Sequence, residues 1–364
     1  MSNNLSLDER LKLVKEVGEE IVTEEELIKL LKEKQRPVAY DGFEPSGQIH
    51  IAQGLLRAIN VNKMTKAGFV FKMWVADWFG LINNKMGGDI EKIRTVGKYF
   101  IEVWKSTGMD LENVQFIWAS DFIKSHPEYW ELVLKIGMKK NLPRVLRTIE
   151  IMGRSEKDTL TAAQVIYPLM QAADIFMLEA DVAQLGMDQR KVNMLAREVA
   201  DDLALIKPIS VSHHMLVGLL PTTEVSGESA VDKSIRLKMS KSKPDSAIFM
   251  TDTREDIERK IKNAWCPEGE TKENPVLEYC KYIVFEKVDK MHIDRAEKFG
   301  GDVDYASYTD LERDYKDKKL YPLDLKNALI KYLKEFLEPT RRHFEENEEA
   351  KKLKELVESY AVTR

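Results

Sequence analysis

Cysteine is scarce in this chain of 364 residues, which has only Cys266 and Cys280. Two thiols cannot by themselves build a disulfide framework or a four-ligand zinc site, so both are expected to pack as reduced groups. No stretch reaches the apolar length of a membrane span. The polar, acidic N-terminus has neither an apolar signal core nor an Arg-rich transit character. These absences predict a cytoplasmic protein without membrane attachment.

Two familiar phosphate-binding signatures are also missing. GFEPSG (42–47) has the glycine spacing of a P-loop, but Gln48 and Ile49 follow where a P-loop needs Lys and Ser or Thr. No G-x-G-x-x-G segment follows an expected strand, so a dinucleotide-binding fold has no support. A net charge of −5 gives no global attraction to nucleic acid, and any polyanion must be held by local basic patches.

What the chain does contain is an alternation of strand-like and helical segments. Residues 5–34 have the pattern of an amphipathic helix. Strand-like segments follow at 37–43, 69–78, 114–120 and 175–186, and helical segments at 51–67, 89–107, 127–140 and 187–203. Strands that alternate with helices of this length predict a parallel sheet with helices on both faces.

The composition changes near residue 250. A polar insert, PTTEVSGESAVDKS (221–234), is expected to form a mobile loop, and charged helical segments dominate from 252 onward. A chain of this length suggests more than one domain. We therefore expect an N-terminal helical segment at 1–35, an α/β domain at 36–248 with a flexible region at 221–244, and a mostly α-helical domain at 249–364.

One candidate phosphate site is the helix start expected after SGQIHIAQG (46–54). A helix N-terminus presents unpaired N–H groups and a partial positive charge, which together attract phosphate. His50 and Gln53 are three residues apart, so both would lie on one face of the first turn and could grip ATP oxygens. From this segment alone, a helix-capping histidine is an equal alternative.

A second candidate is the lysine- and serine-rich segment RLKMSKSKPDS (236–246). Lysine is a point charge on a long flexible arm, so Lys238, Lys241 and Lys243 could close over a triphosphate. The alternative is a solvated basic loop, the usual state of such charge runs.

Together these two segments resemble the signatures of class I aminoacyl-tRNA synthetases. HIAQ (50–53) resembles HIGH, and KMSKS (238–242) matches the second signature letter for letter. The resemblance implies an α/β fold, a Rossmann-like parallel-sheet catalytic domain followed by a mostly α-helical anticodon-binding domain. It implies catalytic roles for His50, Lys238 and Lys241. It also implies ATP-binding roles for these three and for Gly47, Gln53, Met239, Ser240 and Ser242.

YPLMQAADIFMLEADVAQLGMDQRK (167–191) resembles the amino-acid-binding segment of the tyrosyl and tryptophanyl enzymes. The archaeal and eukaryotic tyrosyl pattern is matched by Tyr167, Gln171 and Asp174, followed by Gln189. The first three fall at i, i+4 and i+7, which is one face of a helix. By resemblance, Tyr167, Gln171 and Gln189 hold the substrate α-ammonium.

The implied specificity depends on the substrate hydroxyl. By resemblance, Asp174 accepts the phenol O–H and Tyr40, at the end of the first strand, makes a second contact; a core tyrosine is the alternative for Tyr40 taken singly. A site that binds a hydroxyl leaves buried polar groups unpaired when phenylalanine enters.

The nearest alternative function is that of a tryptophanyl enzyme, but Tyr40, Gln171 and Gln189 argue against it. A catalytically dead RNA-binding relative is opposed by the intact KMSKS.

The helical domain carries a further resemblance. EKFGGD (297–302) and YPLDLKNAL (321–329) are similar to anticodon-binding pieces of the archaeal and eukaryotic tyrosyl enzymes. Phe299 would stack on the first anticodon base and Asp324 would hydrogen-bond it, with Tyr321 where relatives often carry histidine. A packed Phe before a Gly-Gly turn and a helix-capping Asp are the alternatives.

The resemblance also implies the partners. These are L-tyrosine, ATP and tRNA(Tyr), with Mg²⁺ carried by ATP as part of the substrate and no metal held by the protein. It implies a homodimer with 89–107 and 114–150 near the interface. Basic segments at 254–262 and 326–342 are candidates for contacts with the tRNA backbone, although such residues more often form a solvated helix face.

Overall fold

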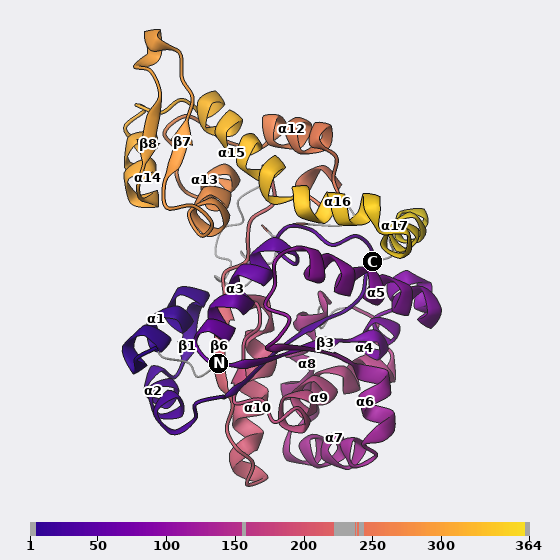
Figure 1. Ribbon diagram of the computed structural model, residues 1–364. Coiled ribbons are helices and arrows are strands. Elements are labelled where there is room, and N and C mark those ends of the chain that lie inside the picture. Colours follow the sequence, from indigo (N-terminus) through magenta and orange to yellow (C-terminus); the bar gives the residue numbers. More distant parts are fainter. Residues whose placement is uncertain (1–4, 155–157, 222–236, 238, 240–243, 361–364) are drawn as a thin grey trace.

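The computed structural model describes residues 5–154, 158–221, 237, 239 and 244–360 (Figure 1). The helices are α1 (Leu7–Val17), α2 (Glu24–Glu33), α3 (Leu55–Lys66), α4 (Asp77–Ile82), α5 (Ile90–Ser106), α6 (Ala119–Ser125), α7 (Glu128–Lys139), α8 (Leu142–Leu146), α9 (Ala162–Met177), α10 (Arg190–Asp202), α12 (Arg254–Asn263), α13 (Pro275–Tyr279), α14 (Tyr308–Lys316), α15 (Pro322–Phe336), α16 (Glu338–Glu346) and α17 (Glu348–Ser359). The strands are β1 (Gly18–Val22), β2 (Val38–Phe43), β3 (Val70–Val75), β4 (Val114–Trp118), β5 (Val182–Ala183), β6 (Ile209–His213), β7 (Met291–Ile293) and β8 (Val303–Tyr305). Short single-turn helices are η1 (Lys85–Gly88), η2 (Ile149–Met152), η3 (Met187–Gln189), η4 (Pro244–Ser246), η5 (Cys280–Val284) and η6 (Glu297–Phe299).

The main sheet has the strand order β1-β6-β5-β2-β3-β4. All neighbours pair in parallel except β1, which pairs antiparallel with β6. Successive strands run from β2 outward to β4 on one side, and then return to β5 and β6 on the other. The order therefore reverses between β2 and β5, and in open α/β sheets ligands bind beyond the carboxyl ends of the strands at such a point. The parallel sheet predicted from the alternating pattern is confirmed.

Three expected elements differ from the structure. The amphipathic helix expected over 5–34 is divided by β1, because GEEIV pairs with β6 and Thr23 then starts α2 with a capping box. The strand expected over 175–186 shrinks to Val182–Ala183, since α9 continues through Met177. The helix expected from Ile51 begins only at Leu55, after a turn.

The part of the chain after residue 250 is mostly helical, as expected, with one small antiparallel sheet of β7 and β8. Its apolar core is continuous with that of the sheet domain, and Met250, Ile257 and Tyr279 belong to the same buried cluster as Phe71. The last two helices, α16 and α17, return to the sheet domain and lie beside α5 (Figure 1). None of the helices in the described ranges is long and apolar enough to cross a bilayer.

Candidate active site

The predicted amino-acid-binding residues meet beside the reversal point of the sheet. Tyr40 lies on β2, and Tyr167, Gln171 and Asp174 lie on α9, whose first turn is fixed by a capping box at Thr161. All four predicted side chains are buried. The i, i+4 and i+7 spacing of Tyr167, Gln171 and Asp174 lies within the single helix α9, as the sequence predicted.

One end of this group is built around Asp174. Its Oδ1 accepts a hydrogen bond from the Tyr129 hydroxyl at 2.7 Å, while Oδ2 makes no direct hydrogen bond within the described residues. Burial raises the pKa of Asp174 well above its usual value, although the hydrogen bond from Tyr129 opposes the rise. Burial and the nearby Asp174 charge also raise the pKa of Tyr40, so its hydroxyl stays protonated. Asp174 can therefore accept a hydrogen bond from a buried substrate hydroxyl, and the Tyr40 O–H group can make a second hydrogen bond with it.

The other end carries acceptors suited to a cation. The Tyr167 hydroxyl donates to Glu44 Oε1 at 2.6 Å, and Gln171 Nε2 donates to Gln189 Oε1 at 3.1 Å. Gln189 Nε2 in turn donates to the Ile151 carbonyl at 3.1 Å, which fixes the orientation of its amide. The structure therefore brings Tyr167, Gln171 and Gln189 together as predicted.

Glu44 was not identified from the sequence. It follows directly after β2, where parallel sheets place their binding groups, and that position was the available signal. Burial, followed by the charge of Glu44, raises the pKa of Tyr167 and keeps its hydroxyl a donor. The carboxylate also accepts from Asn83 Nδ2 at 3.1 Å and lies 3.6 Å from Lys85 Nζ. Glu44 therefore places a carboxylate in direct contact with Tyr167, one of the predicted amino-acid-binding residues.

The segment with His50 forms a turn that pairs with the chain just after the second signature. Ile51 N donates to the Ile248 carbonyl at 2.8 Å, and Met250 N donates to the Ile49 carbonyl at 2.9 Å. His50 thus forms an antiparallel bridge with Phe249. Backbone hydrogen bonds therefore join the His50 segment to residues 248–250, which follow the second signature in sequence.

The expectation that His50 and Gln53 lie in the first helical turn is wrong. Gln53 N donates to the His50 carbonyl at 2.9 Å in a turn that precedes α3, and the helix begins at Leu55. Gly47 has a φ of +102°, which L side chains rarely adopt, so glycine is required at the entry to this turn. The Gln53 Oε1 atom is buried without a hydrogen-bond partner in the described ranges. His50 and Gln53 therefore lie in a half-buried turn outside the helix rather than in its first turn.

Most of the second signature, namely Lys238, Ser240, Lys241 and Ser242, lies outside the described residues, as do Lys243 and the insert at 222–236. Met239 is described and is only 5% exposed, with its Sδ 3.7 Å from the Tyr279 hydroxyl. The Met239 thioether therefore packs into the core rather than into solvent.

A buried polar network lies under the turn and was not anticipated. Arg57 on α3 pairs with Asp41 of β2 at 3.0 Å and donates to Gln184, which follows β5. Its second branch contacts the His213 ring at 2.7 Å. Burial raises the pKa of Asp41 to about 7 against the effect of Arg57, and burial followed by Arg57 lowers the pKa of His213. The network ties α3 to three strands at the edge where the site lies.

The predicted anticodon residues are exposed at the far end of the helical part. Phe299 is 63% exposed and Tyr321 is 59% exposed. Arg295 Nε donates to the Gly301 carbonyl at 2.8 Å and its Nη1 donates to the Lys319 carbonyl at 3.1 Å. Arg295 therefore holds the turn that carries Phe299 against the segment that leads to Tyr321. Helix α15 begins directly after Tyr321, and Asp324 lies in its first turn.

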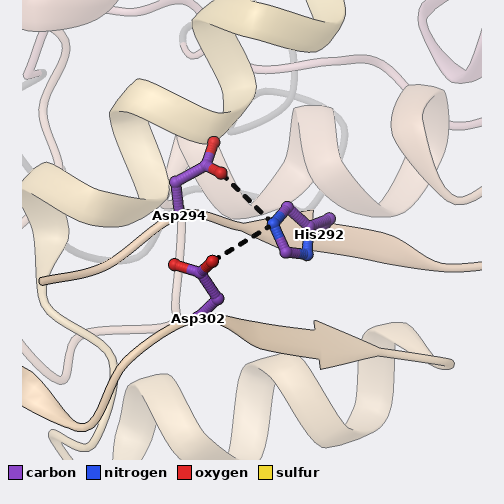
Figure 2. Close-up of side chains that lie close together, drawn as sticks. All are labelled: His292, Asp294 and Asp302. Atoms are coloured by element: carbon purple, nitrogen blue, oxygen red, sulfur yellow. Dashed lines mark hydrogen bonds and ion pairs between the residues drawn. The ribbon is translucent and has the colours of Figure 1, made fainter. Parts of the chain in front are cut away.

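A charged cluster closes the base of that turn (Figure 2). The His292 Nε2 atom lies 3.2 Å from Asp294 and 3.9 Å from Asp302, on the two chain segments that flank the turn. On its other side Nδ1 lies 2.8 Å from Asp304, which raises the pKa of His292. Lys331 pairs with Asp294 at 3.0 Å and Lys290 pairs with Asp304 at 2.7 Å. The ion pairs hold the two flanking segments together.

The strand order of the parallel sheet reverses between β2 and β5, and the His50 turn pairs with residues 248–250, just after the KMSKS sequence. This arrangement is that of a class I aminoacyl-tRNA synthetase. The family described as "tRNA synthetases class I (W and Y)" matches residues 32–338. The chain belongs to this family of aminoacyl-tRNA ligases. Membership confirms the resemblance and the fold class that the sequence predicted.

Relatives of the tyrosine branch are similar over nearly the whole chain. Tyrosine--tRNA ligase 1, cytoplasmic, of Arabidopsis thaliana is 51% identical over 360 residues, which cover 98% of this chain and 90% of that one. A Leishmania major tyrosyl-tRNA synthetase in complex with tyrosinol has a TM-score of 0.89 at 48% identity and covers 98% of this chain. This chain spans only 61% of that Leishmania chain. A Pyrococcus horikoshii tyrosyl-tRNA synthetase with L-tyrosine has a TM-score of 0.89 at 39% identity, covering 96% and 100% of the two chains.

Proposed function

We propose that the chain joins L-tyrosine to tRNA(Tyr) at the expense of ATP. The observation that carries the proposal is the buried pair of Tyr40 and Asp174, which offers an O–H group and an open carboxylate oxygen where a phenol would end. Relatives named as tyrosine–tRNA ligases, and neighbours solved with tyrosine or tyrosinol, support it.

The reaction has two steps. The tyrosine carboxylate attacks the α-phosphorus of ATP, a new P–O bond forms, and pyrophosphate leaves with the electron pair of the broken bond. A hydroxyl of the terminal tRNA ribose then attacks the adenylate carbonyl and AMP leaves. The carboxylate is ionised at neutral pH, so the first step needs no general base. Rate enhancement comes from positioning and from charge placed where the transition state develops it.

ATP lies along the His50 turn in this mechanism. His50, Gly47 and Gln53 contact it from the turn, and Gln53 Oε1, which has no hydrogen-bond partner in the described residues, accepts a donor of the nucleotide. Lys238 and Lys241 supply positive charge to the phosphates from outside the described residues, beside Met239, Ser240 and Ser242. Mg²⁺ would enter as part of the ATP substrate, bound to its phosphate oxygens.

Tyrosine is held at both of its ends. Its hydroxyl donates to Asp174 and contacts Tyr40. Its α-ammonium lies among Tyr167, Gln171 and Gln189, with Glu44 supplying the negative charge of that end. Charge-assisted hydrogen bonds of this kind are stronger than neutral ones, so Glu44 contributes to orientation as well as affinity.

The test is pyrophosphate exchange with each of the twenty amino acids and with His50→Ala. Exchange with tyrosine alone is expected, and tryptophan-dependent exchange would indicate the sister specificity instead. His50→Ala is expected to lower the exchange rate at saturation more than it weakens tyrosine binding, measured by calorimetry. Unchanged exchange kinetics in this variant would remove His50 from the catalytic set.

We propose that the turn with Phe299 reads the tRNA anticodon, together with Tyr321 and Asp324. The exposed Phe299 ring offers a stacking surface, and base–aromatic stacking is worth about 1–3 kcal/mol. Phe299→Ala should therefore raise the KM for tRNA about tenfold or more and leave pyrophosphate exchange unchanged. Equal loss in both assays would instead indicate a folding defect.

We propose a homodimer through the exposed stripe on α7. Trp130, Leu134 and Met138 are spaced by four residues and are 42%, 68% and 85% exposed, and Leu142 beyond them is 57% exposed. Contiguous apolar surface of this kind marks interaction sites. The expected involvement of 89–107 is less favoured, because α17 lies along α5 in the same chain. Leu134→Asp should shift the mass in light scattering to that of a monomer, whereas Leu356→Asp on α17 should not.

We further propose that the protein acts in the cytoplasm. The Arabidopsis relative carries that location in its name.

A further inference from the structure

The C-terminal helices α16 and α17 leave the anticodon end of the molecule and lie across the sheet domain. Figure 1 shows them, in yellow, beside α5 of the sheet domain. Their contacts are therefore made with the part of the chain that holds the ATP turn.

On α16 the contacts are polar and aromatic. His343 Nε2 lies 2.9 Å from Glu102 Oε2 of α5. The next residue, Phe344, is only 2% exposed, and its ring centroid lies 5.3 Å from that of Tyr99. A buried aromatic pair of this kind fixes α16 against α5.

The same helix α5 holds the ATP turn. Trp104 Nε1 donates to the Gln53 carbonyl at 2.8 Å. The Tyr99 hydroxyl lies 3.2 Å from Thr251 Oγ1, next to Met250, whose backbone pairs with Ile49. On α5, Trp104 meets the turn and Glu102 meets α16, so the two contacts lie within one turn of the helix.

On α17 the contact with the turn is direct. Gln48 Nε2 donates to Glu358 Oε1 at 3.2 Å, two residues before His50. Val357, next to Glu358, is 3% exposed and anchors this end of the helix in the core. The tip of the C-terminal helix therefore touches the ATP turn itself.

We propose that α16 and α17 form a brace that positions the turn at 47–53 for ATP, with Gln48 and Glu358 as positioning residues. The inference rests on the proposed function, because it takes this turn as the ATP site. The predicted tyrosine-binding residues instead contact Tyr129 of α7, Ile151 of η2 and Glu44. The brace should therefore act on ATP and leave tyrosine unaffected.

The experiment measures pyrophosphate exchange for the full chain and three single variants. Glu358→Ala and Gln48→Ala each remove one partner of the contact. Glu355→Ala is the matched control, since it removes an exposed glutamate from the same helix one turn earlier. One hydrogen bond corresponds to roughly a threefold change in an equilibrium constant. We expect the KM for ATP to rise about threefold in the first two variants, with the KM for tyrosine unchanged in all three.

The double variant Gln48→Ala/Glu358→Ala supplies a further check. It should show no greater rise in the KM for ATP than either single change, because both remove the same contact. A KM for ATP in Glu358→Ala equal to that of Glu355→Ala would overturn the brace, as would equal rises for ATP and tyrosine. Absence of tyrosine-dependent exchange in the unaltered chain would instead refute the proposed function.

Discussion

His214 joins three parts of the molecule and should make the stability of the fold depend on pH. It follows β6 directly, and its ring lies 3.3 Å from Glu19 of β1 and 3.1 Å from Glu278 of α13. The ring also stacks on Tyr282 with centroids 4.3 Å apart. Burial alone would lower its pKa, but the hydrogen bonds to the two carboxylates outweigh burial and raise the pKa to about 9.

The size of the effect follows from that shift. The pKa of His214 rises from the ordinary histidine value of 6.5 to about 9 in the folded protein. Each pKa unit corresponds to about 1.4 kcal/mol, so protonated His214 stabilises the folded state by about 3 kcal/mol. Because the folded pKa is the higher one, this stability is fully present below pH 6.5 and is lost as pH rises through about 9. The pKa of the neighbouring His213 is lowered, so its titration lies below this window.

Urea unfolding of the unaltered chain and of His214→Gln, followed by circular dichroism between pH 6.5 and 9.5, measures this effect. The difference in unfolding free energy between the two proteins should shrink by about 3 kcal/mol across the range. Other groups that titrate near pH 9 cancel in the difference. Glu278→Gln removes one of the two carboxylates and should reduce the pH dependence without abolishing it. A difference that stays constant with pH would refute the ionic role of His214.

Three further substitutions test particular contacts. Tyr40→Phe should lower kcat/KM for tyrosine up to about tenfold in pyrophosphate exchange and barely change it for phenylalanine; equal losses would contradict the hydroxyl contact. Gly54→Ala would place its Cβ 2.4 Å from the Met250 side chain and should cost about 1–3 kcal/mol in urea unfolding, with partial recovery in Gly54→Ala/Met250→Ala. Arg10→Met removes buried hydrogen bonds to the Ala67 and Leu31 carbonyls and should cost about 3 kcal/mol in the same assay.

The parallel sheet was predictable because apolar β-rich runs such as the one that becomes β3 alternate with helical segments of about one crossover length. The grouping of Tyr167, Gln171 and Asp174 on α9 was predictable because their spacing is that of one helix face. β1 was not, since GEEIV has no strand pattern of its own and exists by pairing with β6. Glu44 was missed for a similar reason, because its role depends on Tyr167, which is distant in sequence and meets it only in the fold.

The polarity of the amino-acid site explains why tyrosine would enter in one orientation. Burial raises the pKa of Asp174 and weakens the negative charge at the phenol end. The ammonium group is therefore favoured at the other end, where Glu44 contacts Tyr167. Glu44 is followed in sequence by the turn at 47–53, so an ammonium held beside it leaves the substrate carboxylate directed toward bound ATP. Glu44→Gln should then weaken tyrosine binding without exposing the phenol end, and a gain in affinity for phenylalanine would contradict this account.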